Sequence, residues 1–427
     1  MNANLGELLT YMLFLIFAAG LGLFLIVGRD LAPTAKFQNA LSGGGRWFLG
    51  AGLGAGAIVL TLKLVIILAL SQAPQVTVTP LIAHLAHEAM PEGEDKASED
   101  MRLRLGWQAL PDAAPAPADN PLTQEKAALG ERLFFDPNLS LDRTVACASC
   151  HDVSGKAGAD GRATALGINS QIGPRNAPTV WNAAFQAVQF WDGRASSLEE
   201  QAKGPPVNLG EMGMPSLEAV AMRVRADESY RDAFARAFGE SAPIGIDAIA
   251  KAIASYERTL ITPDAPFDRF MHGDGDALAP DQKRGMALFR SAGCITCHSG
   301  PNFSQASLFP PFASDRYLMA SRSPLAAKYR LGEDKGKAPK DSPNGIWRIP
   351  SLRNVALTAP YFHNGAVSDL KEAVRVMAEA QLNAVIEGSG RAPKPGQKYL
   401  SRQDIDDLAA FLTALSSDRL TPKLARR

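Results

Sequence analysis

The residues best able to do chemistry in this chain are four cysteines and two histidines, arranged in two copies of one pattern. The copies are Cys147-Ala-Ser-Cys150-His151 and Cys294-Ile-Thr-Cys297-His298. These are all the cysteines of the 427-residue chain, too few for a disulfide scaffold of this size. C-x-x-C-H is the attachment signature of haem c, in which two thiols form thioethers with the haem and the adjacent histidine binds the iron. The sequence therefore predicts two covalently bound haem c groups.

A zinc site built from two C-x-x-C pairs is the alternative interpretation of these motifs. Zinc does not explain why a histidine follows both pairs, nor the long separation between them. Haem c is attached on the outer face of the bacterial membrane. The topology expected from the amino terminus places both motifs on that side.

Two apolar runs near the amino terminus predict a membrane anchor in residues 1–71. Residues 8–28 carry no charge and are long enough to span a bilayer, and residues 47–71 are interrupted only by Lys63. A retained helix is favoured over a cleaved signal peptide, because the first ten residues hold no Lys or Arg and no A-x-A site follows. Lys63 either snorkels to the interface or faces a partner helix or ligand.

Charges between the two runs predict the orientation. Arg29, Lys36 and Arg46 stand against Asp30 in the short loop, so the positive-inside rule places this loop in the cytoplasm. Everything after residue 71 is then periplasmic, and the chain is expected in the inner membrane.

Residues 72–120 have the composition of a periplasmic linker. An acidic stretch precedes the Ala/Pro run PDAAPAPADNP, which is typical of a semi-extended spacer. His84 and His87 lie at helical spacing just beyond the second apolar run. They could bind a metal or a quinol, but the polar face of an interfacial helix is the favoured interpretation.

The rest of the chain has helical periodicity, and few stretches alternate like strands. Helices are expected in 122–135, 216–238, 246–260 and 281–293, so the soluble part is mainly α. We expect a first haem domain in 121–270, a second in 271–400, and in 401–427 a C-terminal helix and tail that pack back on the first. With 44 Lys+Arg against 44 Asp+Glu and no long basic run, nucleic acid is excluded as a partner.

Haem alone does not distinguish an electron carrier from an enzyme. A carrier needs both axial positions of each iron filled. A peroxidase needs an open sixth position, a nearby acid/base group and a source of a second electron. Methionine is the usual sixth ligand on an electron-transfer haem and raises its potential.

Several co-linear segments from about Leu122 to Leu415 resemble the bacterial dihaem cytochrome c peroxidases and their relatives, which include the methylamine-utilisation dihaem maturase. The resemblance implies two cytochrome-c-like haem domains that follow the two membrane helices. The matching segments are LGERLFFDPNLS (129–140), GPRNAPTVWNAAF (173–185), QFWDGR (189–194), ASYERTLITPDAPFDRF (254–270) and RIPSLRNVALTAPYFHNG (348–365).

The resemblance also implies roles for individual residues. His151 would be the proximal ligand of the peroxidatic haem and His298 that of the electron-transfer haem. Met377, fourteen residues after His363, would be the sixth ligand of the second haem. Trp191 would carry electrons between the haems.

Two further sets of residues follow from the same resemblance. Gln201 and Glu211 would line the distal pocket of the first haem with Pro205 beside them, and Glu211 would move the proton. Asn176, with the backbone carbonyls of Thr358 and Pro360, would form a calcium site, because such oxygen donors suit Ca²⁺. His363 either neighbours the second haem or packs in a turn, and His272 is expected in an exposed loop.

The chain departs from the family at one point. Many dihaem peroxidases have a histidine that blocks the first iron in the resting state, and this position holds Ile168. No histidine occurs from Asp152 to Met271. Unless Met212 or Met214 replaces it, the first haem is predicted to be five-coordinate or water-bound when both irons are oxidised.

These observations favour a membrane-anchored peroxidase that reduces hydrogen peroxide to water. The electron donor would be a small cytochrome, a cupredoxin, quinol or a respiratory complex, and the family suggests a homodimer. One alternative is a maturase-like oxidase of a protein or organic substrate, since that branch also lacks the blocking histidine. That branch has a tyrosine where this chain has Met377. A second alternative is a non-catalytic dihaem carrier of a membrane complex.

Overall fold

The computed structural model describes residues 106–309, 317–319 and 323–420. The predicted membrane helices at 8–28 and 47–71 lie outside these residues, as do Lys63, His84 and His87. Among the described residues, no helix has the length and apolar character needed to cross a bilayer. All described residues belong to one compact unit that spans Glu88–Arg427.

The described chain is mainly helical, which confirms the predicted class. Two short sheets complete it. β1 (Tyr317–Met319) pairs antiparallel with β2 (Ile346–Arg348), and β3 (Val385–Ile386) pairs parallel with β4 (Tyr399–Leu400). The shorter helices are α7 (Cys147–Cys150), α8 (Leu198–Ala202), α9 (Gly204–Val207), α13 (Pro266–Met271) and α15 (Pro324–Lys328).

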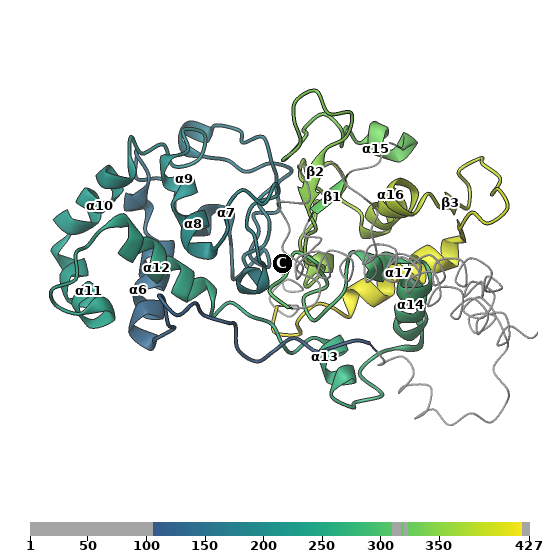
Figure 1. Ribbon diagram of the computed structural model, residues 1–427, viewed down its shortest axis with the longest axis horizontal. Coiled ribbons are helices and arrows are strands. Elements are labelled where there is room, and N and C mark those ends of the chain that lie inside the picture. The colour runs from purple at the N-terminus through teal and green to yellow at the C-terminus, as the bar shows by residue number, and fades with distance from the viewer. Residues whose placement is uncertain (1–105, 310–316, 320–322, 421–427) are drawn as a thin grey trace, which may run out of the picture. The chain divides into compact units, whose positions relative to one another are not determined.

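Two crossed helices form the centre of the first haem domain. α6 (Gln124–Phe134) and α12 (Ile246–Glu257) meet at Gly130, where a Cβ would lie 1.9 Å from the Ala252 carbonyl oxygen. Glycine is therefore required for this close approach. α10 (Leu217–Ala226) and α11 (Arg231–Phe238) add apolar side chains to the same core. In Figure 1 these four helices lie together on the left.

The second haem domain also has two helices that approach closely at a glycine. α14 (Pro280–Ser291) crosses α17 (Arg402–Thr413) at Gly285, where a Cβ would lie 1.9 Å from the Asp407 carbonyl oxygen. α16 (Leu370–Leu382) lies beside α17 and adds to the same half of the unit, on the right of Figure 1. The second core is rich in phenylalanine. The ring centroids of Phe289 and Phe411, for example, lie 5.4 Å apart.

The C-terminal helix corrects one prediction. We expected it to pack back on the first haem domain, but α17 buries Ile405 and Phe411 in the second core. The tail after the helix does reach the segment that joins the domains: Ser417 and Arg419 bond to the Asp264 carboxylate. The apolar face of α17 decides its place, because the second core is where those side chains are buried.

The domain boundary is also earlier than predicted. α13, which ends at Met271, contributes Phe267 and Phe270 to the second core, both fully buried. The second domain therefore begins at α13 instead of at residue 271.

The end of the predicted linker is packed instead of free. Trp107 is buried in the second core, edge-on to Phe267 at 5.8 Å. Asn120 is fully buried at the first core, where its side chain donates hydrogen bonds to Glu199 and to the Lys251 carbonyl. We call residues 107–120 the strap. Its proline-rich composition did not indicate the anchoring effect of one buried tryptophan.

A segment of each domain repeats the same local structure 172 residues apart. Asn182 and Asn354 both have left-handed backbones (φ 63° and 60°), and each begins a 3-10 helix, Ala183–Phe185 and Val355–Leu357. Phe190 and Phe362 follow at the same offset, again with positive φ (65° and 72°). We call residues 178–205 and 350–377 the repeat. FWDG (190–193) and FHNG (362–365) stand at this offset, but the repeat was not predicted from them.

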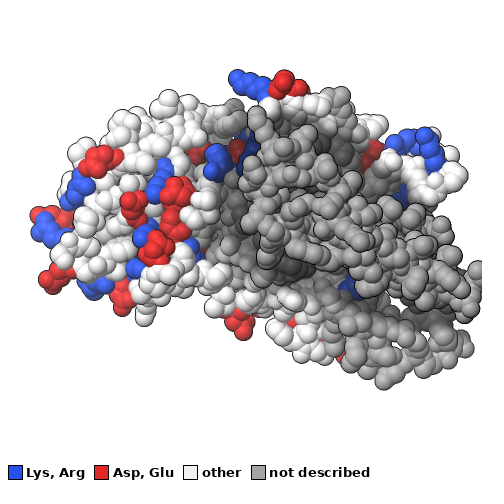
Figure 2. All heavy atoms as spheres, viewed as in Figure 1, with Lys and Arg blue, Asp and Glu red and all other residues white. Residues whose placement is uncertain are grey.

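Acidic and basic side chains are interspersed over the face of the first haem domain that Figure 2 shows. This mixture agrees with the balanced charge of the whole chain. It is not the concentrated basic surface that nucleic acid binding requires.

Candidate active site

A cavity of about 600 Å³ lies beside the second motif. Cys294, Cys297 and His298 line it from the motif, and Met377 lines it from α16. This volume is typical of sites that enclose a cofactor. Most of the remaining lining is apolar, with Leu352, Leu400, Leu408 and Leu412 among it, as a porphyrin ring requires.

His298 is oriented as an iron ligand would be. Its Nδ1 lies 3.0 Å from the Phe303 carbonyl oxygen, which assigns the proton to Nδ1 and leaves Nε2 for a metal. Burial lowers the pKa of His298, so the imidazole is neutral. Burial also raises the pKa of Cys294 to about 11. None of the four cysteines forms a disulfide, so all four thiols are available for thioether bonds.

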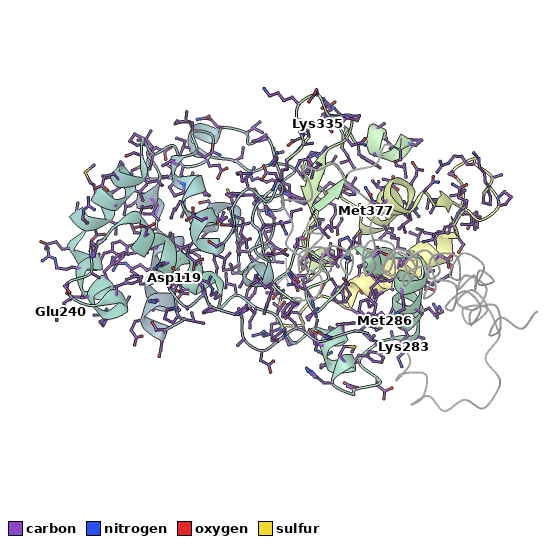
Figure 3. All side chains as sticks on the ribbon, in the orientation of Figure 1. Asp119, Glu240, Lys283, Met286, Lys335 and Met377 are labelled. Atoms are coloured by element: carbon purple, nitrogen blue, oxygen red, sulfur yellow. The ribbon has the colours of Figure 1, made fainter. Side chains whose placement is uncertain are left out.

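Met377 is the only methionine among the described residues that line this cavity. Met286, on α14, is instead fully buried in the second core (Figure 3). His363 also lines the cavity, at its border with the first domain. Besides His298, the described lining therefore contains two side chains that could bind an iron, Met377 and His363. Met377 is the one that lies among the apolar side chains.

The first motif has the same local geometry. α7 carries both cysteines, and His151 Nδ1 lies 3.2 Å from the Gly158 carbonyl oxygen. Burial lowers the pKa of His151 and raises that of Cys147 to about 12 and that of Cys150 to about 11. Both motifs thus present half-buried cysteines and a neutral imidazole whose Nε2 is left for iron.

Glu211 faces the first motif. Its negative charge contributes to the raised pKa of both Cys147 and Cys150. Burial raises the pKa of Glu211 itself, while a hydrogen bond of 2.7 Å from the Asn208 amide opposes this shift. A carboxylate with a raised pKa is suited to exchange a proton near neutral pH.

The other two predicted distal residues lie on the short helices before Glu211. Gln201 lies near the end of α8 and Pro205 near the start of α9, both half-buried. They are four residues apart, the spacing of one helical turn.

Ile168 lies against the loop that carries Glu211. Its amide donates to the Glu211 carbonyl at 2.8 Å, and its side chain is 4% exposed in the first core. Met212 and Met214 are also packed in this core, each 2% exposed. Both methionines therefore belong to the first core.

Trp191 joins the two domains. Its Nε1 donates to the Asn176 carbonyl at 2.8 Å, and its own carbonyl accepts from the Arg348 amide at 2.9 Å. Its ring lies 6.5 Å from that of His363, edge to face. Trp191 and Asn176 also line the cavity beside the second motif. Loops of the first domain therefore complete the pocket of the second haem.

The three predicted calcium ligands lie around this same cavity. Asn176, Thr358 and Pro360 all line it, and the Asn176 side-chain amide donates to the Arg162 carbonyl at 2.8 Å. This hydrogen bond fixes the orientation of the Asn176 side chain through its nitrogen, so the side-chain oxygen is left for another partner. Within the described residues, no group of three or more His, Cys, Asp or Glu side chains could hold a metal ion.

Trp347, Arg175 and Asp334 lie at the domain border and were not predicted as site residues. Trp347 stacks on His363 with ring centroids 4.0 Å apart, and the Arg175 guanidinium lies 5.0 Å from the Trp347 ring. Arg175 bonds to Asp192 and Asp334, both at 2.7 Å, and so ties the two domains together. The repeat was the available signal for His363, because this residue holds the register position of Trp191.

The repeat also aligns the distal residues. Ser197 caps α8 and Asp369 caps α16 at the same offset, which places Pro205 in the register of Met377. Where the second domain has a methionine sulfur that lines the cavity, the first has a side chain that cannot bind iron.

Comparison with known proteins agrees with this geometry. Residues 124–276 match the family described as di-haem cytochrome c peroxidase, and residues 282–416 match cytochrome c. Cytochrome c551 peroxidase of Pseudomonas aeruginosa is 40% identical over 339 residues, covering 79% of this chain and 91% of that protein. The chain belongs to the di-haem cytochrome c peroxidase family. It is therefore an oxidoreductase that carries two covalently bound haem c groups.

Other members of this family are similar over comparable lengths. The methylamine utilization protein MauG of Methylorubrum extorquens is 37% identical, covering 76% of this chain and 87% of that protein. A crystal structure of a MauG-like protein associated with microbial copper homeostasis superimposes with a TM-score of 0.60 at 29% identity. It covers 74% of this chain and 97% of that one. Both the peroxidase and the MauG branches thus resemble this di-haem protein.

Proposed function

We propose that this protein reduces hydrogen peroxide to water at the haem of the first motif, with electrons that enter through the haem of the second. The observation that carries the proposal is the repeat: Pro205 stands in the first domain where Met377 stands in the second. A haem c bound by His151 would supply an iron that takes up peroxide and passes electrons to it. Neither Pro205 nor Ile168 has a side chain that could bind that iron, so a site for peroxide would stay open there.

Residues of the first domain supply the proton chemistry. Glu211, half-buried and with a raised pKa, accepts a proton from one peroxide oxygen and returns it to the other. Gln201 is the neutral polar group of this pocket. Trp191, in contact with both domains, carries the electrons from the second haem to the first.

Stopped-flow mixing of the purified full-length protein with hydrogen peroxide tests this proposal. We expect turnover with a reduced small cytochrome as donor, and a ferric spectrum that contains a high-spin, five-coordinate or water-bound haem. A wholly low-spin ferric spectrum without turnover would identify a non-catalytic carrier and refute the proposal.

A maturase-like oxidase is the second candidate function, favoured by the absence of any histidine from Asp152 to Met271. Met377 in α16 supports the peroxidase instead, since it gives the second haem a ligand suited to electron transfer. Poor turnover with a reduced cytochrome, together with long-lived oxidised haem after peroxide, would favour the maturase.

We further propose that helices at 8–28 and 47–71 anchor the protein in the inner membrane, with both haem domains in the periplasm. Their length, low charge and basic intervening loop support this. The donor is then a small cytochrome, a cupredoxin, quinol or a respiratory complex, and the active form is a homodimer. Retention of the full chain in carbonate-washed membranes tests the anchor, and light scattering in detergent tests the dimer.

We also propose that Asn176, Thr358 and Pro360 bind Ca²⁺ through their oxygens. Their shared position around one cavity supports this. One equivalent of calcium, removed by a chelator with loss of activity, is the expected result. Metal analysis that finds none would refute it.

A further inference from the structure

The second haem cavity has two chemically different ends. Leu352, Leu400, Leu408 and Leu412 belong to its apolar end, which merges with the second core. The other end adjoins the first domain, and its residues are linked by contacts already described. These residues are Asn176, Trp191, Trp347, Arg348 and His363.

The indole of Trp347 is held firmly at this polar end. One neighbour is the His363 ring, stacked at 4.0 Å and 17°, and another is the Arg175 guanidinium at 5.0 Å. A Cβ at Gly345 would lie 2.8 Å from Trp347 Nε1, and Gly345 itself lines the cavity. Glycine at this position therefore lets the backbone approach the Nε1 edge of the indole closely.

Within the part of the chain that the structure describes, two ring nitrogens at this end have no hydrogen-bond partner. Trp347 Nε1 and His363 Nε2 are both buried, in side chains that are 7% and 5% exposed. An unsatisfied buried polar group costs about 1–3 kcal/mol, and native structures keep few of them. Two such atoms on stacked rings that line one cavity indicate a ligand that accepts hydrogen bonds there.

The haem itself supplies the acceptor. It is an apolar ring with two propionate carboxylates on one edge, and the cavity is apolar at one end and polar at the other. We infer that Trp347 Nε1 and His363 Nε2 donate hydrogen bonds to a propionate of the second haem. Lys335, half-buried in the loop before β2 (Figure 3), lines the same cavity and adds positive charge.

Charges around these two rings agree with this assignment. Asp334 and Asp192 are both engaged by Arg175, so neither carboxylate takes the place of the acceptor. The proposed hydrogen bonds from Trp347 and His363 concern only the binding of the second haem. They do not depend on whether the first haem reduces peroxide or oxidises another substrate.

The test uses Trp347→Phe in the full-length protein with both haems attached. Phenylalanine keeps the stacked ring and removes the N–H, so the propionate becomes more negative and stabilises ferric iron. We expect the reduction equilibrium of the second haem to shift about fivefold toward the ferric form, the effect of one lost hydrogen bond. The propionate bending band in the resonance Raman spectrum should also fall in frequency.

Trp107→Phe is the matched control, because Trp107 is buried in the second core and does not line the cavity. It should leave both the equilibrium and the Raman band unchanged. If Trp347→Phe matches the wild type in both measurements, the inference is wrong.

His363 provides an independent pair of variants should Trp347→Phe not load haem. His363→Gln keeps an N–H donor and should retain the wild-type potential, whereas His363→Leu should lower it. Equal potentials for both variants would overturn the role of His363. A change of spin state in His363→Leu would do so as well, since it would identify His363 as an iron ligand.

Discussion

The two halves of the repeat have one backbone plan and two different endings. Both begin with a left-handed asparagine and a 3-10 helix, and both reach a capped helix at the same offset. In the second domain this helix, α16, runs for 13 residues and carries Met377. In the first, α8 ends after five residues at Ala202. The presence of a methionine at this register position in one domain only thus goes together with how one helix continues.

Proline explains the difference. Pro205 and Pro206 have no amide hydrogen to continue the hydrogen bonding of α8, and their rings clash with the preceding turn. The chain therefore restarts as the four-residue α9. Pro205, which stands in the register of Met377, thus also contributes to ending the helix that would have presented a side chain there.

Pro205→Met is the sharpest way to break this comparison. It places a thioether in the register of Met377, so we expect the first haem to become six-coordinate and low-spin and peroxide turnover to be almost abolished. Ferric absorption spectra and steady-state rates measure both effects. Pro243→Met, in an exposed loop of the same domain, is the control. Unchanged spin state in Pro205→Met would show that the register does not extend to the iron.

Glu211→Gln separates proton transfer from ligation. The amide cannot accept the peroxide proton, so we expect turnover to fall by about 10²- to 10⁴-fold with both haems still attached. Glu240→Gln, at an exposed position of the same domain (Figure 3), should keep the wild-type rate. A near-normal rate in Glu211→Gln would remove this carboxylate from the mechanism.

The pH profile sharpens the same point. Burial raises the pKa of Glu211, and the carboxylate is the form that accepts a proton. Wild-type turnover should therefore fall on acidification, with a midpoint above the usual glutamate pKa of about 4.3. The residual activity of Glu211→Gln should lack this midpoint. A profile that is the same in both proteins would assign the midpoint to another group.

The smallest predicted effect is on the pH dependence of the free energy of unfolding. It contrasts a buried carboxyl group in each domain. Glu257 in α12 is buried with Oε2 unpartnered, and burial raises its pKa to about 8. Asp407 in α17 is bonded to Arg284 at 2.8 Å, which lowers its pKa. Folding thus adds a proton to Glu257 between its unfolded pKa and about 8, so its contribution to stability falls as pH rises through that window.

Glu257→Gln should remove this dependence and stabilise the protein at pH 9 relative to the wild type. The expected slope is about 1.4 kcal/mol per pH unit, measured by denaturant unfolding at several pH values. The conservative Asp232→Asn, in α11, is the control. If wild type and Glu257→Gln lose stability equally between pH 6 and 9, the buried carboxyl is not the cause.

The sequence predicted what depends on local pattern. The two C-x-x-C-H motifs identified the haems, and 3.6-residue periodicity located α6, α12 and α14 to within a few residues. The sequence did not predict which domain α17 packs on. An apolar face shows that a helix is buried, but it does not show against which core. The contact between Trp347 and His363 was missed for a similar reason, since each side chain alone has the pattern of a core residue.

The strap has a mechanical consequence. Trp107 is buried in one haem domain and Asn120 in the other, joined by continuous backbone whose Pro115 carbonyl accepts a hydrogen bond from Arg258 on the way. Separating the domains would pull the indole out of the second core or the amide out of the first. The strap is therefore a second covalent connection between the domains, in addition to the segment between α12 and α13, and a protease cut within it would remove this connection without touching either haem motif.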